Sequence, residues 1–180
     1  MKPFITSSPG DLRVLYENFG VSFHYTQMLE DELKLILVVA EHQGLARFDR
    51  KKDLRMKGGD DNLVDACLGP LKKVLKTNLP PKDGDEFYIA LDEANKARNL
   101  LAHRFFIVHA VDLLSEAGLA AINQHLSKLY LTIRHAHTMS RTIREHLFAK
   151  VGFSPEDARR ELDELKRIID EPLSDDDEAA

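Results

Sequence analysis

Apolar residues in this sequence recur at intervals of three and four, the spacing of a helix that buries one face. After Phe23 they fall at positions 25, 28, 29, 33, 36, 37 and 40. Stretches that alternate apolar and polar residues, as half-buried strands do, are nearly absent. The pattern therefore predicts an all-α protein.

Two capping signals mark expected helix starts. The stretches 8–11 (SPGD) and 154–157 (SPED) both place a serine before a proline, with an acid at the third helical position. The first signal predicts a helix that runs to about Gln43 and is bent or broken at Gly20. The second predicts a short helix over residues 155–170.

Glycine and proline bound the remaining helices, which we expect over residues 62–77, 85–114 and 119–150. Pro70 must lie in a first turn or at a kink, because proline lacks a backbone N–H. Gly152 ends the last long helix. The sum predicts an antiparallel four-helix bundle with an additional short C-terminal helix. We expect one domain over residues 1–171 and an acidic disordered tail over residues 172–180.

Composition narrows the class of protein. The chain has 180 residues, of which 43% are hydrophobic and 31% charged, as in a soluble globular domain. The single cysteine, Cys67, excludes an intramolecular disulfide and a multi-cysteine zinc site. No secretory signal and no transmembrane stretch are visible. These features predict a cytoplasmic protein with no membrane partner.

The helix expected over 85–114 carries polar groups among its apolar positions, most densely in residues 97–106, ARNLLAHRFF. Arg98 falls in an apolar stripe made by Leu91, Ala94, Leu101, Phe105 and Val108. A second stripe consists of Leu100, Ile107, Val111 and Leu114. A helix with two apolar sides should lie centrally in a bundle. Arg98 should then be partly buried and paired, with Asp92, Glu93 or backbone carbonyls as candidate partners.

Three residues of this segment are candidates for catalysis. Asn99 and His103 are four residues apart and share a helical face. Arg98 lies about 140° around the helix from His103, so the two meet only if the arginine reaches around or acts across a subunit boundary. The bare spacing is weak, because Arg104 with His109 and Arg141 with His146 repeat it. What distinguishes the first pair is the asparagine directly after the arginine and the aromatic residues after the histidine.

That context resembles the HEPN superfamily, whose hallmark is an arginine and a histidine separated by four to six residues, often with asparagine after the arginine. The resemblance covers residues 20–148 in architecture and only Arg98, Asn99 and His103 in motif. It implies a homodimer in which the motifs of two protomers face each other across a cleft. Arg98 and His103 would be catalytic, and Asn99 would orient them.

One departure from the family concerns regulation. HEPN toxins that are paired with nucleotidyltransferase antitoxins typically carry a tyrosine two residues after the histidine, and this chain has Phe105 there. Phenylalanine has no hydroxyl to modify, so that mode of silencing is not expected. A cognate antitoxin or other regulator stays unknown. Some HEPN members lack nuclease activity, so the motif alone does not establish catalysis.

The chemistry that these residues support is RNA cleavage without a metal or cofactor. RNA carries its own nucleophile, the 2′-hydroxyl. One histidine can take its proton, a second copy can protonate the leaving 5′-oxygen, and an arginine can hold the phosphate. The products would be a 2′,3′-cyclic phosphate and a 5′-hydroxyl. The alternative is a non-enzymatic interaction or structural protein in which Arg98 and His103 stabilise the core or the dimer interface.

A basic loop between residues 45 and 61 could contact RNA phosphates through Arg47, Arg50, Lys51, Lys52, Arg55 and Lys57. With a silent motif, such a loop would make the protein a non-catalytic RNA binder. The other interpretation is a solvated loop, and the net charge of −5 argues against non-specific nucleic-acid binding. No metal site is expected, since His135 and His137 fall on different helical faces. We interpret these two, with His24, His42 and His125, as surface or interface histidines.

Overall fold

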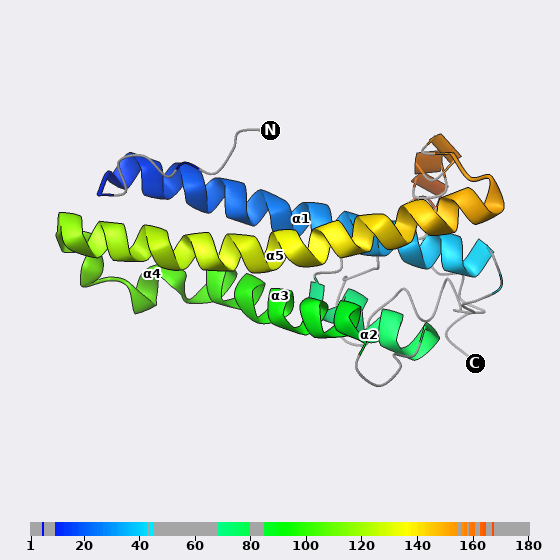
Figure 1. Cartoon of the computed structure of the whole chain (residues 1–180), viewed down its shortest axis with the longest axis horizontal. Helices are drawn as coiled ribbons and strands as arrows, with labels where there is room; N and C mark the ends of the chain where they lie inside the picture. The colour runs from blue at the N-terminus through cyan, green and yellow to red at the C-terminus, as the bar shows by residue number, and fades with distance from the viewer. Residues whose placement is uncertain are drawn as a thin grey trace, which may run out of the picture. The chain divides into compact units, whose positions relative to one another are not determined.

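A computed structural model describes most of the helical part of the chain (Figure 1). The residues described are 5, 10–42, 44, 68–79, 85–154, 156, 157, 159, 160, 163, 164 and 167. They form helices α1 (Leu12–His42), α2 (Leu68–Asn78), α3 (Glu86–His103), α4 (Phe105–Val108) and α5 (Glu116–Val151), and the 3-10 helix η1 (Asp112–Leu114). These residues contain no strand, so the prediction of an all-α protein is confirmed.

The chain forms two compact units, residues 1–32 with 81–141 and residues 33–80 with 142–180. The first unit contains the candidate catalytic segment. The prediction of one domain over residues 1–171 stays a prediction. The expected tail, residues 172–180, lies outside the described residues.

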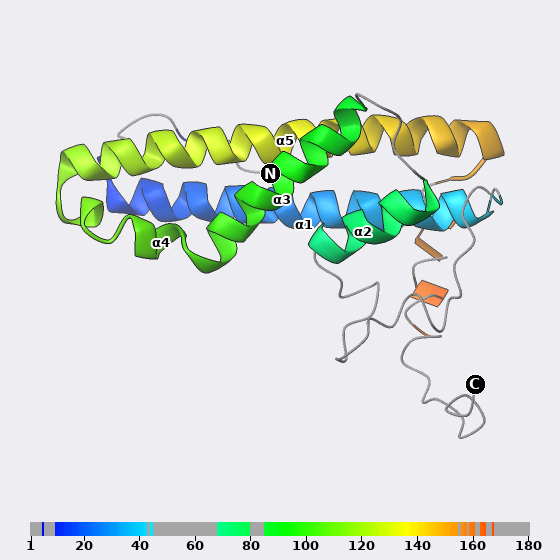
Figure 2. The same ribbon diagram turned by 90° about the horizontal axis from the view of Figure 1, so that it is seen from below.

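In the first unit, α1 and α5 run side by side in the same direction, and α3 lies obliquely across them in the opposite direction (Figures 1 and 2). Asn18 contacts Asn123, Tyr25 contacts Tyr130 and Glu32 contacts His137. The residue numbers rise together in steps of seven, which only parallel helices allow. The antiparallel arrangement expected for the first and last long helices is therefore wrong. Among the described residues of this unit, α3 runs back along the other two long helices. α5 therefore starts beside the start of α1 and runs in the same direction.

These three polar contacts, which we call the polar seam, fix how α1 lies against α5. Asn18 is fully buried; its Nδ2 donates to Asn123 Oδ1 at 3.1 Å and to the Ile5 carbonyl at 2.8 Å. The rings of Tyr25 and Tyr130 meet edge to face at 5.1 Å. Burial, and then the hydrogen bond with Tyr25, raise the pKa of Tyr130. Because buried polar groups must keep their partners, a shift of one helix along the other is costly.

The helix expected over residues 85–114 is not continuous. α3 ends at His103, and Arg104 leaves the helical region with φ −136° and ψ −11°. Leu91, Ala94, Leu101 and Phe105 are buried as predicted, whereas Val108 is 55% exposed. The second predicted stripe also fails, because Ile107, Val111 and Leu114 are 75–85% exposed. The break at Arg104 turns the chain, so residues beyond it no longer follow the helical face set before it.

The helix start predicted at Ser154 is confirmed, whereas the one predicted after Ser8 is wrong. At Ser154 the predicted capping box is confirmed: the serine Oγ accepts from Asp157 N at 3.1 Å, and Asp157 Oδ2 accepts from Ser154 N at 2.9 Å. Ser154 Oγ also donates to Asp157 Oδ2 at 2.7 Å, and this bond, followed by the one from Ser154 N, lowers the pKa of Asp157. The first long helix begins at Leu12 rather than directly after Ser8, and Asp11 Oδ1 accepts from Arg13 N at 2.8 Å. A bend or a break was expected at Gly20, and the helix continues through this residue without a break.

Two predicted features of the helix ends in the second unit are confirmed. Pro70 lies in the first turn of α2. Gly152 has a φ of +66°, which glycine adopts without strain, and the Phe153 N–H donates to the Phe148 carbonyl at 3.0 Å. Phe153 also packs on Phe148, which forms a small core with Val39. Predicted helix residues 62–67 lie outside the described residues; the described residues of the expected 155–170 helix are helical.

Gly118 and Gly20 provide a matched test of the packing at the start of α5. A β-carbon at Gly118 would overlap the backbone of Asp112, whereas at Gly20 no described atom lies within 4 Å. We expect Gly118→Ala to lower the free energy of unfolding by about 1–3 kcal/mol. Gly20→Ala should raise it by about 0.5–1 kcal/mol, as alanine does in an open helix. Urea unfolding measures both, and a Gly118→Ala variant as stable as wild type would contradict this contact.

Candidate functional site

Arg98 projects from α3 toward α1 and is held at two points. Its Nε lies 3.5 Å from Glu30 Oε1, and its Nη1 donates to Asn99 Oδ1 at 3.5 Å. The side chains of Arg98 and Glu30 are each 14% exposed. Partial burial and pairing of Arg98 are thus confirmed. The ion-pair partner that the structure shows is Glu30, which lies on another helix.

Glu30 is a site residue that sequence reasoning missed. It lies beside the buried Leu29 and near the buried Leu33 on α1, in a run of three acids, Glu30, Asp31 and Glu32. The periodicity of α1 shows that Glu30 borders an apolar face, but it cannot name the residue across the interface. The sequence therefore indicates that Glu30 is a half-buried carboxylate, but it does not indicate that Arg98 is its partner.

His103 and Asn99 lie one turn apart on α3, and both are exposed. Within the described part of the chain, no hydrogen bond or ion pair joins His103 to Arg98. The structure thus brings together Arg98, Asn99 and Glu30, and leaves the histidine in solvent at the end of the helix. An exposed histidine is not a satisfied core residue, which was one of the two structural roles considered for it.

The guanidinium of Arg98 has donors on two sides. Its Nε faces the Glu30 carboxylate, whereas its Nη1 contacts Asn99 on the exposed side of α3. An arginine carries five N–H donors in a rigid fork, so one edge can bind a carboxylate while the other binds a second anion. The arrangement is therefore compatible with a phosphate bound beside Asn99.

Phe105, two residues after His103, belongs to the core. It is 1% exposed, and its ring centroid lies 5.7 Å from that of Phe19, 5.4 Å from Phe106 and 5.1 Å from His109. A hydroxyl at this position would be buried among aromatic rings. Phe105 thus has no hydroxyl to modify, and its side chain is also not accessible to solvent.

A second group of titratable side chains lies beyond this core and was not anticipated. His109 Nδ1 lies 3.0 Å from Asp112 Oδ2, and His109 Nε2 lies 2.8 Å from His125 Nδ1. Burial, and then the charges of His109 and Lys128, lower the pKa of His125. The spacing of His109 and Asp112 could have suggested a local pair, but nothing in the sequence connects them to His125.

The interpretation of the other histidines as surface or interface groups is wrong for His137. It is 7% exposed, and its ring meets the Tyr25 ring edge to face at 5.6 Å. His24 and His135 are exposed as expected, and the side chain of His42 lies outside the description. His137 lies on the face of α5 that contacts α1, where it is opposite Glu32 in the polar seam.

Four aliphatic side chains on α4, η1 and the turn between them face solvent. We call them the exposed aliphatic segment: Ile107 (75% exposed), Val108 (55%), Val111 (80%) and Leu114 (85%). Single exposed aliphatic residues are ordinary, but several in one short stretch are typical of an interaction surface. This segment begins four residues after His103.

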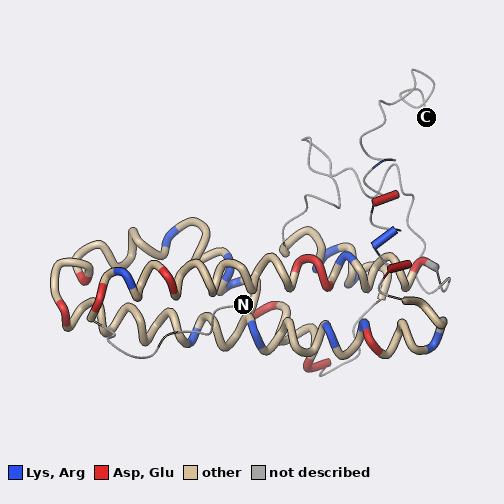
Figure 3. The backbone as a smooth tube through the Cα atoms, turned by 90° about the horizontal axis from the view of Figure 1, so that it is seen from above, with Lys and Arg blue, Asp and Glu red and all other residues tan. Residues whose placement is uncertain are grey.

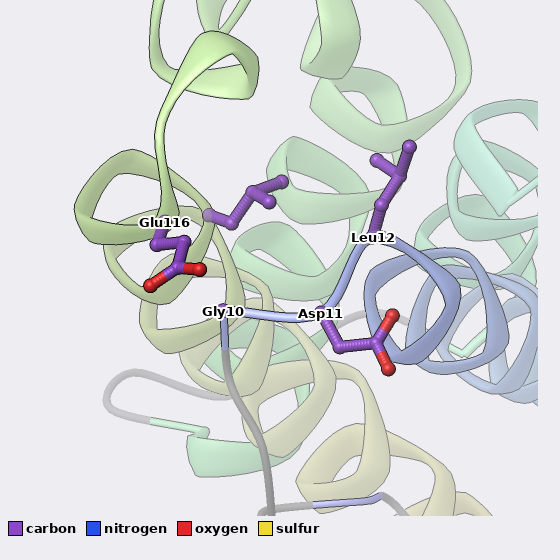
Figure 4. Close-up of a pocket in the computed structure, with 5 residues that line it drawn as sticks. Gly10, Asp11, Leu12 and Glu116 are labelled. Carbon is purple, nitrogen blue, oxygen red and sulfur yellow. The ribbon is translucent and has the colours of Figure 1, made fainter.

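An open depression of about 560 Å³ lies elsewhere in the first unit, at the start of α1 and α5 (Figure 4). Gly10, Asp11, Leu12, Glu116 and Leu119 line it, so none of the candidate catalytic residues does. Among the described residues, no group of three or more histidine, cysteine, aspartate or glutamate side chains could hold a metal ion.

Charge on the described helices is mixed. Figure 3 shows lysine and arginine interspersed with aspartate and glutamate along the tubes. The predicted RNA-contacting residues Arg47, Arg50, Lys51, Lys52, Arg55 and Lys57, and also Cys67, lie outside the described residues. No described helix has the length and apolar character needed to cross a membrane.

Comparisons do not add a family to this picture. The chain matches no protein-family model, no curated protein and no solved structure.

Proposed function

We propose that the protein is a metal-independent endoribonuclease of HEPN type, a homodimeric four-helix bundle that cleaves RNA at a cleft between two copies of Arg98, Asn99 and His103. The observation that carries the proposal is the arrangement on α3. Arg98 is held between Glu30 and Asn99, while His103, one turn beyond Asn99, is open to solvent. A positioned cation and an accessible imidazole on the same helix are two of the groups that this reaction needs.

In the proposed reaction, His103 takes the proton from the 2′-hydroxyl, whose oxygen then attacks the adjacent phosphorus. The bond from phosphorus to the 5′-oxygen breaks, and the second copy of His103 donates a proton to that oxygen. Arg98 binds the phosphate and stabilises the charge that develops on it. Asn99 and Glu30 keep the guanidinium in place. The products carry a 2′,3′-cyclic phosphate and a 5′-hydroxyl.

The exposed aliphatic segment favours a second candidate, a non-enzymatic interaction protein. Under this proposal, Arg98 neutralises Glu30 and stabilises the contact between α3 and α1. His103 then has no chemical role. A silent RNA binder that uses the loop at residues 47–57 is a variant of the same candidate.

Cleavage of mixed cellular RNA in the presence of EDTA tests the proposal. We expect the purified protein to cut RNA and to leave ends of defined chemistry, because the 2′-hydroxyl is the nucleophile. The new 5′ ends should accept phosphate from polynucleotide kinase without prior phosphatase treatment. Cleavage that EDTA abolishes, or products with 3′-hydroxyl ends, would contradict the proposed mechanism.

Arg98 is best tested with lysine, since Arg98→Ala would leave Glu30 half-buried without this cation. Arg98→Lys keeps a positive charge near Glu30 but removes the planar fork. Arg104→Lys is the matched control, because Arg104 is exposed and lies on the same segment. Cleavage lost in the first variant and kept in the second would support a phosphate-binding role for Arg98.

A further inference from the structure

Three titratable side chains connect the end of α4 and η1 to α5. Asp112 Oδ2 lies 3.0 Å from His109 Nδ1, and His109 Nε2 lies 2.8 Å from His125 Nδ1. The His109 side chain is 13% exposed. Both imidazoles also contact the buried ring of Phe105, at 5.1 Å for His109 and 6.1 Å for His125. All of these residues belong to the first unit.

Hydrogen-bond chemistry fixes where the protons lie in this chain. An ionised carboxylate only accepts, so His109 must carry its proton on Nδ1 and donate it to Asp112. His109 Nε2 is then an acceptor, and His125 Nδ1 must be the donor across the 2.8 Å contact. The remaining nitrogen, His125 Nε2, has a free lone pair in this arrangement.

The first and second protons have opposite effects. The first can enter at His125 Nε2 while the bridging proton moves to His109 Nε2, so that the charge lies beside Asp112 and the bond to His125 becomes charge-assisted. The second must enter at His125 Nδ1, where it meets the N–H of His109. Two N–H donors on two positively charged rings would then face each other 2.8 Å apart. Their repulsion would break the hydrogen bond.

We propose that Asp112, His109 and His125 form a proton-operated latch, which holds residues 105–114 against α5 while at most one imidazole is charged and releases them when both are. The proposal concerns a segment outside the candidate catalytic residues. It does not depend on whether the protein cleaves RNA.

The groups around the latch come from every element that packs there. η1 contributes Asp112, the turn after α4 contributes His109, and α5 contributes His125 and Lys128. α1 contributes Phe19, which packs on Phe105. The closed latch therefore has one carboxylate on one side and a lysine on the other.

The direction of the pH effect follows from His125. Burial first, and then His109 and Lys128, lower its pKa below the ordinary 6.5. The unfolded chain therefore binds this proton more readily than the folded chain does. The contribution to stability is present above the ordinary value and is lost as the pH falls below it.

Release would change a surface, since residues 105–114 carry the exposed aliphatic segment. It would also separate the Asp112 carbonyl from Gly118, where the backbones of η1 and α5 touch. Five backbone N–H groups report the state of this region, because they donate hydrogen bonds within it or to Arg104: those of Val108, His109, Ala110, Leu113 and Leu114.

Hydrogen exchange read by mass spectrometry tests the latch in the full-length protein. We expect the protection factors of residues 108–114, corrected for intrinsic exchange, to fall at least about tenfold between about pH 7.5 and about pH 5. Those of residues 90–100 in α3 should change by less than about twofold. Equal protection of residues 108–114 at both pH values would overturn the proposal.

His125→Asn separates titration from bonding, because its side-chain amide can donate to His109 Nε2 and does not titrate. We expect this variant to keep residues 108–114 protected at both pH values. His135→Asn, an exposed histidine on the same helix, should keep the wild-type response. A wild-type response in His125→Asn would overturn the latch.

If His125→Asn does not fold, nitrogen NMR of the wild-type imidazoles decides. The latch requires the Nδ1–H form of both His109 and His125 at about pH 7.5. It also requires that loss of protection accompany the second protonation. Another pair of tautomers, or full protection with both rings charged, would overturn it.

Discussion

Replacing Phe105 with alanine is expected to lower the free energy of unfolding by about 3–5 kcal/mol. The ring is 1% exposed and packs against Phe19, Phe106 and His109, so its removal leaves a cavity that these rings cannot fill without moving. For a chain of this length, the loss corresponds to a fall in melting temperature of roughly 10 °C. Urea and thermal unfolding followed by circular dichroism measure both quantities.

Phe106→Ala is the matched control, because Phe106 adjoins Phe105 in sequence but is only partly buried. We expect it to cost about half as much or less. Phe105→Tyr should also destabilise, by about 1–3 kcal/mol, since it places a hydroxyl among aromatic rings. Equal losses for Phe105→Ala and Phe106→Ala would contradict the central position of Phe105.

Replacing His103 with asparagine is expected to reduce RNA cleavage by about 100- to 10,000-fold, the usual contribution of a general acid or base. The melting temperature should change by no more than about 1–2 °C, because exposed side chains seldom contribute more than about 0.5 kcal/mol. The measurement is the initial rate of cleavage with EDTA present, alongside thermal unfolding of the same preparation.

His24→Asn serves as the control, since His24 is an exposed histidine on α1. It should leave the cleavage rate and the melting temperature unchanged. If His103→Asn cleaves at the wild-type rate, the proposed catalytic role is wrong. If it also melts many degrees lower, His103 stabilises the fold or a subunit contact, and the interaction protein becomes the better proposal.

Features set by local chemistry were predictable from the sequence. The capping box at Ser154, the helix end at Gly152 and the first-turn position of Pro70 each depend on residues within one or two turns. The partial burial of Arg98 was predictable too, because it falls in an apolar stripe. In each case the residue itself carries the physical constraint.

Features set by distant neighbours were not predictable. Arg104 is neither glycine nor proline, yet α3 ends before it. Phe105 is buried against α1 as the stripe predicts, but Val108, the next residue of the stripe, is exposed. Glu30 contacts Arg98, and His125 contacts His109, only because the helices that carry them pack side by side. Periodicity identifies the buried face of a helix but not the helix that covers it.

The polar seam also has a consequence for how the chain is made. Asn18 and Asn123 are separated by 105 residues, and Tyr25 with Tyr130 and Glu32 with His137 keep the same offset. Contacts of such range form slowly, because a long loop must close before any of them contributes. A ribosome adding about 5–20 residues per second needs roughly 5–20 s to deliver α5 after α1 has emerged. Throughout that interval the α5-facing side of α1 lacks its native cover, so we expect nascent chains to need a chaperone there.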